Sequence, residues 1–297
     1  MNARQIDKMK LKKSAYILFF GLLIIQVCPL YAQLPNKVGG LISADRNAAV
    51  LSKNETPHAA FMSIIDKTSV FYVPSAVNAL NYLSNRPNIA DIMSWDPNFA
   101  VVAKSLDWGV TSGKMEFQKV GAIKRYGQYL MVWKRGKKGD WKVAVRAEVE
   151  NFGKNKSADL VYFEPDDSWY LKHRSQVRLK QREDVVLSTD ELFSTILKAD
   201  NQAGYREFLT DDVRFYYPWQ EEIIGKNNVL SFLKKQRIDI VTEPASVGRA
   251  YSGEFAYSQG TATVHTKEKA IKFNYIRIWQ LTEEYKWKVM LEMLFER

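Results

Sequence analysis

Two strand-like runs place aromatic side chains at alternate positions, the spacing that gathers them on one face of a strand. The two sets stand at equivalent places in the chain and comprise Tyr129, Met131 and Trp133 in the first and Tyr275, Arg277 and Trp279 in the second. Arg277 replaces an apolar Met131, so the second set would hold a cation between two aromatic rings. A guanidinium in such a place suits a carboxylate or an enolate. The alternative is an arginine whose stem only covers an aromatic outer face.

Glu292 is a further candidate for binding or acid–base work. It lies late in a terminal strand, on the face that a period of two assigns to Met290 and Leu294. A partly buried carboxylate there would bind or catalyse. An ion pair at a domain interface, with Arg146 as its partner, is the competing interpretation.

Other candidates flank these strands. Asp107 and Glu254 occupy equivalent positions before a strand, and Glu254 is an alternative base. Water-exposed residues of hairpin turns are the simpler interpretation of both. Trp95, Tyr217 and Trp219 stand where the mouth of a cavity is expected, although aromatic residues at strand spacing more often build a core.

The sequence predicts no metal centre and no cofactor. His58, His173 and His265 lie far apart, and none belongs to a pair with the spacing of metal ligands. The single cysteine, Cys28, lies in the amino-terminal segment. Neither a nucleophile elbow nor a glycine-rich phosphate loop is present.

Residues 1–32 have the pattern of a signal peptide. Five basic residues precede an apolar run over 15–28, and Leu30-Tyr31-Ala32 offers a cleavage site before Gln33. The run is shorter than the roughly 20 residues of a membrane span. We therefore expect export to the periplasm or the medium, with membrane contact only through this segment. An uncleaved anchor and lipidation at Cys28 are the alternatives.

The charge does not indicate a nucleic-acid partner. The whole chain has a formal net charge of +10. Removing residues 1–32 deletes five Lys or Arg and one Asp, which leaves 38 basic against 32 acidic residues. No dense basic cluster interleaved with aromatics remains, so the excess charge favours solubility or weak attraction to anionic surfaces.

The second half of the chain repeats the first. The segment YLMVWKRGKKGDWKV at 129–143 recurs as YIRIWQLTEEYKWKV at 275–289, an offset of 146. Gly113 recurs as Gly260 and Pro74 as Pro218, with offsets of 147 and 144. Such drift is typical of two copies of one domain that have diverged by small loop insertions.

Each copy reads as helices, a strand, a helix and then an antiparallel meander. In the first, helices are expected over 38–51, 57–65 and 76–83 and strands over 68–73, 98–105, 109–117, 125–135 and 141–149. In the second, a capping box at Ser188 opens a helix. A helical piece near 205–209, a strand over 213–217 and a helix from Gly225 to about 236 follow, then strands near 244–252, 255–264, 271–281 and 286–295. This order predicts an α+β fold with helices on one face of a curved antiparallel sheet.

The predicted domains are therefore 33–151 and 188–297. Residues 152–187 match neither copy and are interpreted as a linker, with a charged helix from Trp169 to about Val185. That helix is either a basic contact surface or a solvated connector docked through its apolar residues.

At these motifs the chain resembles the superfamily of nuclear transport factor 2, which includes SnoaL-like cyclases and ketosteroid isomerases. The first copy carries Ser94-Trp95-Asp96-Pro97, Leu106 to Gly113, and Tyr126 to Val143, which are similar to elements of an exported subgroup. The second keeps Asp211-Asp212-Val213, Gly225-Lys226 and Tyr275 to Val289. The resemblance implies two conical domains, each with a pocket between helices and concave sheet, paired sheet to sheet within the chain.

The resemblance does not carry the isomerase chemistry with it. In ketosteroid isomerases the general base is an Asp just before the proline that ends the first strand. The corresponding residues here are Val73 and Tyr217. Valine has no proton acceptor, and tyrosine has a reference pKa near 10, so neither serves as that base.

These observations predict an exported protein that binds a small apolar or carboxylate-bearing molecule in one or both pockets. The candidate ligand residues are Trp95, Tyr129, Trp133, Tyr217, Trp219, Tyr275, Arg277, Trp279 and Glu292. The first alternative is a cofactor-independent isomerase, cyclase or hydrolase, with Arg277 stabilising an oxyanion and Glu254 or Glu292 as base. The second is a structural or protein-interaction module without a ligand. The sequence leaves open the ligand, whether a reaction occurs, and any oligomerisation beyond the internal pair.

Overall fold

A computed structural model describes residues 37–86, 91–136, 138–153, 159–165, 169–171 and 175–297. The predicted signal peptide lies outside the described residues. Within those ranges, no helix is both long and apolar enough to span a membrane. Residues 35–297 form one compact unit.

The first copy folds as a seven-stranded sheet. Its strands are β1 (Val70–Tyr72), β2 (Ala76–Asn78), β3 (Ile92–Val102), β4 (Trp108–Gln118), β5 (Arg125–Arg135), β6 (Trp141–Asn151) and β7 (Val161–Phe163). Their order across the sheet is β2-β1-β6-β5-β4-β3-β7. The four long strands form the expected antiparallel meander, whereas β1 joins β6 in parallel and β7, from the predicted linker, joins β3 in parallel.

The second copy folds as a six-stranded sheet of the same plan. Its strands are β8 (Leu209–Tyr216), β9 (Ile223–Ile224), β10 (Asp239–Arg249), β11 (Phe255–His265), β12 (Ala270–Leu281) and β13 (Trp287–Glu296). Their order is β10-β11-β12-β13-β8-β9, with β8 parallel to β13 as β1 is to β6. The repeat in the sequence is therefore a repeat of topology.

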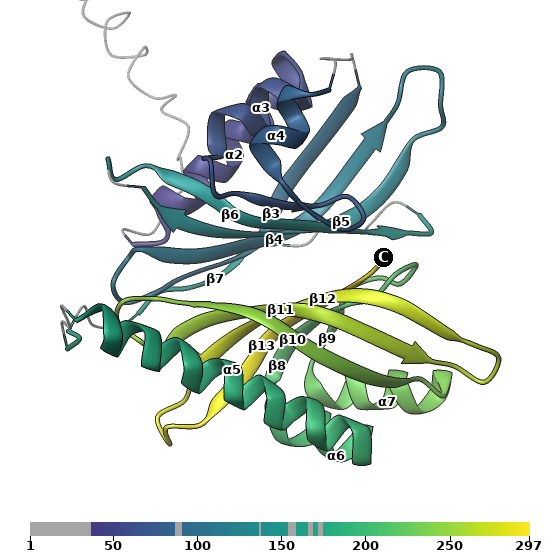
Figure 1. Cartoon of the computed structure of the whole chain (residues 1–297). Helices are drawn as coiled ribbons and strands as arrows, with labels where there is room; N and C mark the ends of the chain where they lie inside the picture. Colours follow the sequence, from purple (N-terminus) through teal and green to yellow (C-terminus); the bar gives the residue numbers. More distant parts are fainter. Residues whose placement is uncertain (1–36, 87–90, 137, 154–158, 166–168, 172–174) are drawn as a thin grey trace, which may run out of the picture. The chain divides into compact units, whose positions relative to one another are not determined.

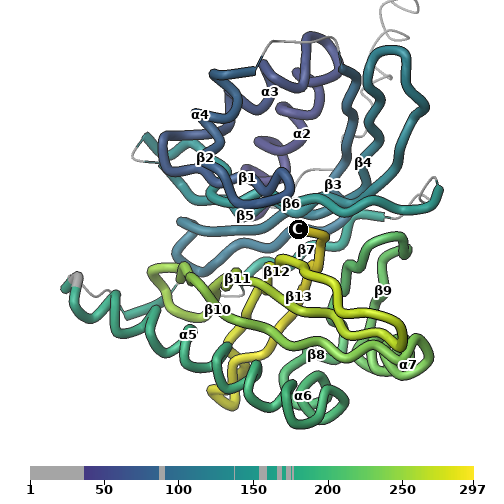
Figure 2. The backbone as a smooth tube through the Cα atoms, turned by 45° about the vertical axis from the view of Figure 1, so that its right-hand side comes forward, coloured from purple at the N-terminus to yellow at the C-terminus, as the bar shows by residue number. Residues whose placement is uncertain are grey.

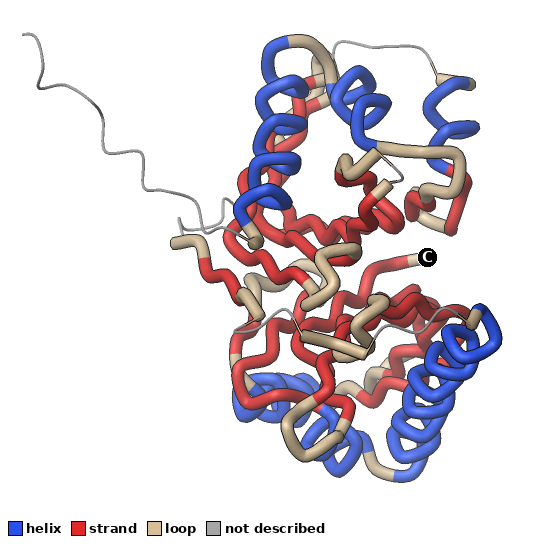
Figure 3. The backbone as a smooth tube through the Cα atoms, turned by 90° about the vertical axis from the view of Figure 1, so that its left-hand side faces the viewer, coloured by secondary structure: helices blue, strands red, loops and turns tan. Residues whose placement is uncertain are grey.

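Helices cover one face of each sheet (Figure 1 and Figure 3). The first sheet carries α2 (Gly39–Asn54), α3 (Pro57–Ile64) and α4 (Ala79–Ser84), and the second carries α5 (Gln176–Ala199), α6 (Asn201–Phe208) and α7 (Lys226–Gln236). One apolar core lies between helices and sheet in each copy. The predicted fold class, two α+β domains with helices on a sheet, is confirmed.

The other face of each sheet contributes to a third core. Because side chains alternate along a strand, Tyr129, Met131 and Trp133 of β5 point to the helices while Leu130 and Val132 point away. The latter pack in one buried cluster with Ile276, Ile278 and Leu291 of the second sheet, among others.

Reciprocal hydrogen bonds join equivalent loops of the two copies. The backbone N–H of Lys104 donates to Glu254 Oε1 (2.6 Å), and that of Tyr251 donates to Asp107 Oδ2 (3.1 Å). Ser105 and Ser252 are equivalent residues whose hydroxyls lie 2.7 Å apart. Asp107 and Glu254 are therefore partly buried cross-copy acceptors, and the interpretation as turn residues exposed to water was wrong.

Several predicted element boundaries were wrong. The strand predicted at 98–105 begins earlier, because β3 already includes residues 94–97. A strand also precedes the short helix α4, whose N-cap is Asn78. Ser188 does not open a helix, because α5 runs through it as a single helix of 24 residues. The predicted domain boundary at 188 therefore lies within α5.

The long strands of both copies bend at the same place. A β-bulge interrupts β3 after Pro97 and β10 after Pro244, and each proline stands opposite a glycine, Gly113 or Gly260. A Cβ on either glycine would lie 2.2 Å from a backbone carbonyl oxygen of the bulged strand. Only glycine allows the two backbones to approach so closely.

We expect Gly113→Ala and Gly260→Ala each to lower the free energy of unfolding by about 1–3 kcal/mol, because the added methyl group forces backbone shifts in a packed sheet. Urea denaturation of the purified variants measures the loss. Gly40→Ala is the matched control, since its Cβ would meet no heavy atom closer than 3.8 Å. A Gly113→Ala protein as stable as Gly40→Ala would contradict the steric account.

Candidate functional site

Each copy buries one carboxylate from its first helix against its meander. Asp45 of α2 and Asp190 of α5 are equivalent, with an offset of 145, and both are fully buried. Tyr129 Oη donates to Asp45 Oδ2 and Tyr275 Oη donates to Asp190 Oδ2, each at 2.8 Å. These bonds fix the helix to the same point of the sheet in both copies.

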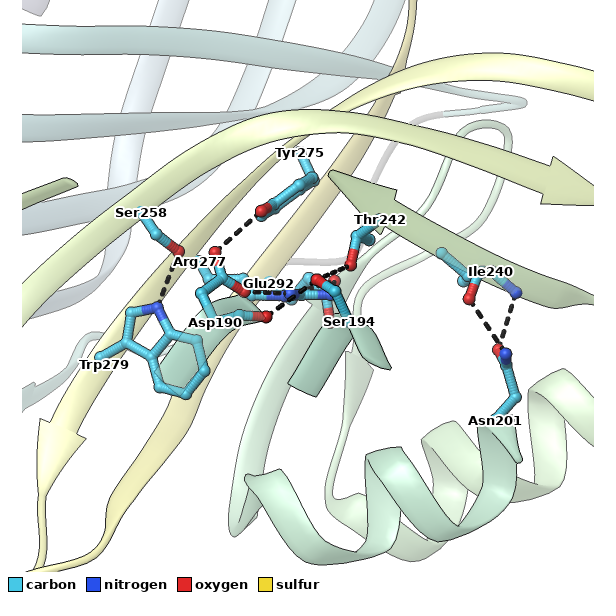
Figure 4. A network of polar contacts seen from close by, with 10 residues as sticks. All are labelled: Asp190, Ser194, Asn201, Ile240, Thr242, Ser258, Tyr275, Arg277, Trp279 and Glu292. Carbon is cyan, nitrogen blue, oxygen red and sulfur yellow. Dashed lines mark hydrogen bonds and ion pairs between the residues drawn. The ribbon is translucent and has the colours of Figure 1, made fainter. Parts of the chain in front are cut away.

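A second polar bond is repeated beside the first. The indole of Trp133 donates to Thr111 Oγ1 and that of Trp279 donates to Ser258 Oγ, both at 2.8 Å. Trp279 and Ser258 appear in Figure 4 with the polar network of the second copy. The four aromatic residues are fully or almost fully buried and hydrogen-bonded to the protein itself.

The environment of the carboxylate differs between the copies. In the first, Trp95 Nε1 also donates to Asp45, at 2.6 Å. Burial raises the pKa of Asp45, although hydrogen bonds from Thr111, Trp95 and Tyr129 act in the opposite direction. Because this pKa is raised, the carboxyl group of Asp45 binds a proton more readily in the folded state than in the unfolded chain.

In the second copy the carboxylate has a cationic partner. Arg277 Nη1 bonds to Asp190 Oδ1, and Arg277 Nε donates to Glu292 Oε1 at 3.0 Å (Figure 4). All three side chains are fully buried. Burial acts to lower the pKa of Arg277, but the charges of Glu292 and Asp190 outweigh it and hold that pKa above its ordinary value. Burial raises the pKa of Glu292 despite Arg277.

The arginine stands on different strands in the two copies. Arg277 on β12 stands opposite Glu292 on β13, whereas Met131 on β5 stands opposite Arg146 on β6. In the second copy the guanidinium reaches the helix carboxylate. In the first, it lies over the rings of Phe61 and Phe71, 4.4 and 5.5 Å from their centroids.

Arg146 borders a cavity of about 860 Å³ between α3, α4 and the first sheet. Apolar side chains form much of its wall, including Phe61, Phe71, Tyr82, Leu83, Ile92, Met93 and Phe117. Pro218, Trp219 and Phe295 of the second copy complete it. The charged lining residues, together with a histidine, are His58, Arg86, Asp91, Lys119, Arg125, Arg146, Glu148, Glu150 and Glu296.

Arg146 is the most deeply buried cation of this wall, and its side chain is 5% exposed. It is paired with Glu148, whose side chain is 29% exposed, and Nη2 also lies 3.8 Å from Met93 Sδ. Its Nε has no hydrogen-bond partner. A buried donor without a partner costs free energy, and an acceptor brought by a ligand would offset that cost.

The predicted ligand residues fall into different places. Of the nine, Trp219 lines this cavity and the other eight do not. Trp95 lies behind the wall, stacked on Phe61 at 5.4 Å. Tyr217 packs on Phe232 and Phe273. Tyr129 and Trp133 of the first copy, and Tyr275, Arg277, Trp279 and Glu292 of the second, are buried within the cores.

Two details of the prediction for Glu292 were wrong. Glu292 pairs with Arg277 and not with Arg146, which pairs with Glu148. Glu292 does not share a face with Met290, because a β-bulge between Val289 and Leu291 inserts one residue. Glu254 accepts from the backbone of Lys104 and does not line the cavity.

Sequence reasoning did not identify Asp45, Asp190 or the cavity position of Arg146. The signal for the two aspartates was available, since aligning the copies pairs Asp45 with Asp190 one position from the main offset of 146. In the part of the chain that the structure describes, no group of three or more His, Cys, Asp or Glu side chains gathers in a way that could hold a metal ion.

Solved structures of similar fold each match about one copy. An NTF2-like protein from Cytophaga hutchinsonii shares 18% identity over 38% of this chain and 97% of its own, with a TM-score of 0.33. A ketosteroid isomerase-like protein from Erwinia carotovora atroseptica shares 14% over 41% and 97%, with a TM-score of 0.31. An LEH-like epoxide hydrolase of M. tuberculosis shares 12% over 39% and 80%, also at 0.31.

No protein-family model and no curated protein matches the chain. These neighbours are named as NTF2-like or ketosteroid isomerase-like proteins, and each covers about one copy of this chain. At these identities the likeness is one of fold alone.

We expect Arg277→Met to lower the free energy of unfolding by about 3–5 kcal/mol, because it leaves the buried carboxylates of Asp190 and Glu292 without a cation. The matched control is Arg146→Met in the first copy. Its partner Glu148 reaches water, so a loss of about 1 kcal/mol or less is expected. Urea denaturation of both variants decides, and equal losses would refute the difference between the copies.

Proposed function

We propose that the protein binds a small, partly apolar molecule with an anionic group in the cavity of its first copy. The observation that carries this proposal is Arg146, a buried cation with an unpartnered Nε at the wall of a largely apolar cavity. The volume of about 860 Å³ is within the usual range of small-molecule sites, about 300–1,000 Å³.

The lining residues suit a ligand of mixed character. The rings of Phe61, Phe71 and Phe117 offer apolar area, and Arg146 offers a donor to a carboxylate or a similar anion. Because Phe61 and Phe71 shield one side of the guanidinium from water, a hydrogen bond formed there meets less competition from solvent.

Binding in the first copy has better support than a reaction in the second. Arg277 and Glu292 are fully buried and paired with each other, so a substrate would have to displace that pair to reach either. In the first copy, His58 Nε2 lies 3.2 Å from the carbonyl oxygen of Leu83, and its role in this proposal is to complete the wall. Export to the periplasm or medium, from the signal predicted at 1–32, is the proposed setting.

Two fluorescent probes with one ring system test the proposal. The anion 8-anilinonaphthalene-1-sulfonate and its neutral analogue N-phenyl-1-naphthylamine are titrated into the protein. We expect both probes to bind. We expect Arg146→Met to lower the affinity for the anionic probe by about 10-fold or more, because a hydrogen bond to a charged group is lost. The neutral probe should change by less than about 3-fold, since it makes no such bond.

Arg125→Met is the control for charge near the cavity. Arg125 also lines it, but its side chain is 45% exposed and paired with Glu150, so its loss should alter both probes little. The proposal fails if neither probe binds the unaltered protein. It also fails if Arg146→Met and Arg125→Met lower the affinity for the anionic probe equally.

A further inference from the structure

The hairpin between β4 and β5 exposes two apolar side chains at its end. We define the hairpin tip as residues 118–125. Val120 is 75% exposed and Ile123 is 83% exposed. Ile92 of β3, which pairs with Gln118, adds a third side chain at 61% exposure. The hairpin extends from the sheet beside the start of β3 (Figure 1 and Figure 2).

The tip is held in a defined turn by its own hydrogen bonds. Ala122 N donates to Lys119 O (3.0 Å), Gln118 Nε2 donates to Ala122 O (2.9 Å), and Gly121 takes a positive φ of 74°. Within this turn the apolar side chains of Val120 and Ile123 stand in solvent. A folded turn that presents apolar side chains to water is suited to insertion into an apolar medium.

The tip and the end of β4 together are basic. Residues 114–125 contain four Lys or Arg and one Glu, a net charge of +3. Lys124 is paired with Glu116 at 3.0 Å, and Arg125 with Glu150 at 2.7 Å. Apolar residues flanked by cations fit the boundary of an anionic bilayer, where the former enter the acyl region and the latter meet the headgroups.

The tip is continuous with the cavity. Phe117, Gln118, Lys119 and Arg125 of the hairpin line it, as does Ile92. A molecule that leaves a bilayer at the tip would therefore pass Lys119 and Arg125 on its way to Arg146.

We propose that residues 118–125 dock the protein on an anionic lipid surface, from which the cavity takes a single-chain anionic amphiphile. The inference rests on the proposed function and adds to it the class of ligand and the partner surface. A lipid surface fits better than a protein, because two or three exposed side chains at a turn give far less contact than the roughly 800 Å² per partner of a standard protein interface.

Docking is tested by co-sedimentation with vesicles of neutral phosphatidylcholine and with vesicles in which about a third of the lipid is phosphatidylglycerol, the anionic fraction being chosen to give a clear surface charge. Because residues 35–297 form one compact unit, the chain from Gln33 onward is used. We expect binding to the anionic vesicles only. Val120→Glu with Ile123→Glu should reduce it by about 10-fold or more, since two carboxylates would face the headgroups.

The matched control places the same charges elsewhere. Val185 and Leu192 of α5 are also apolar and about half exposed, at 52% and 54%. Val185→Glu with Leu192→Glu changes the net charge equally, and its vesicle binding should fall by less than about 3-fold, because most of the surface attraction is local to the tip. The docking proposal would be overturned if the two double variants lost equal amounts of vesicle binding. It would also be overturned if the unaltered protein bound neutral and anionic vesicles equally.

Ligand uptake is tested with cis-parinaric acid, a fluorescent single-chain carboxylate. In solution it should displace 8-anilinonaphthalene-1-sulfonate from the unaltered protein and from Val120→Glu with Ile123→Glu alike, because neither Val120 nor Ile123 lines the cavity. Its transfer from anionic vesicles should slow only in that variant. Binding of the naphthalene probe without displacement by cis-parinaric acid would overturn the ligand class and leave the proposed function standing.

Discussion

The buried carboxylate on the first helix of each copy is the contact on which both domains depend. Asp45 and Asp190 each accept a hydrogen bond from a tyrosine of the central strand, and both side chains are fully buried. A helix packed only through apolar side chains could slide along a sheet, whereas a buried polar bond has one satisfactory geometry. This hydrogen bond fixes the position of the helix and thereby its distance from the sheet. That distance determines whether a cavity can form between them.

The position of one arginine then separates the two copies. Where the guanidinium comes from the central strand, as at Arg277, it meets the helix carboxylate and the neighbouring Glu292, and all three side chains are fully buried. Where it comes from the adjacent strand, as at Arg146, it lies against phenylalanine rings at the edge of a cavity. Two domains with one topology can thus differ in function through an exchange of residue types between neighbouring strands.

Much of the fold followed from local patterns in the sequence. The helix α3 begins at Pro57, as expected, after the N-cap Thr56. The predicted span of β5 is also the one observed, because capping residues and β-branched or aromatic runs act over a few neighbours. The site followed less well. The period of two along a strand predicts that Tyr129 and Trp133 share one face of β5, and that Tyr275 and Trp279 share one face of β12. Whether such a face borders a cavity depends on helices that are distant in sequence. The bulge that moves Met290 away from Glu292 likewise has no local signature in the chain.

The reciprocal loop contacts have the form of an isologous interface, in which equivalent residues of two subunits make the same contacts. Ser105 contacts Ser252, while Lys104 donates to Glu254 and Tyr251 donates to Asp107. In a dimer of identical subunits every substitution occurs twice, so a residue that closes one pocket closes both. Joining the two halves in one polypeptide removes that coupling. A buried cation such as Arg277 can then be present in one half and absent from the equivalent position of the other, and the joined halves need no minimum concentration to stay together.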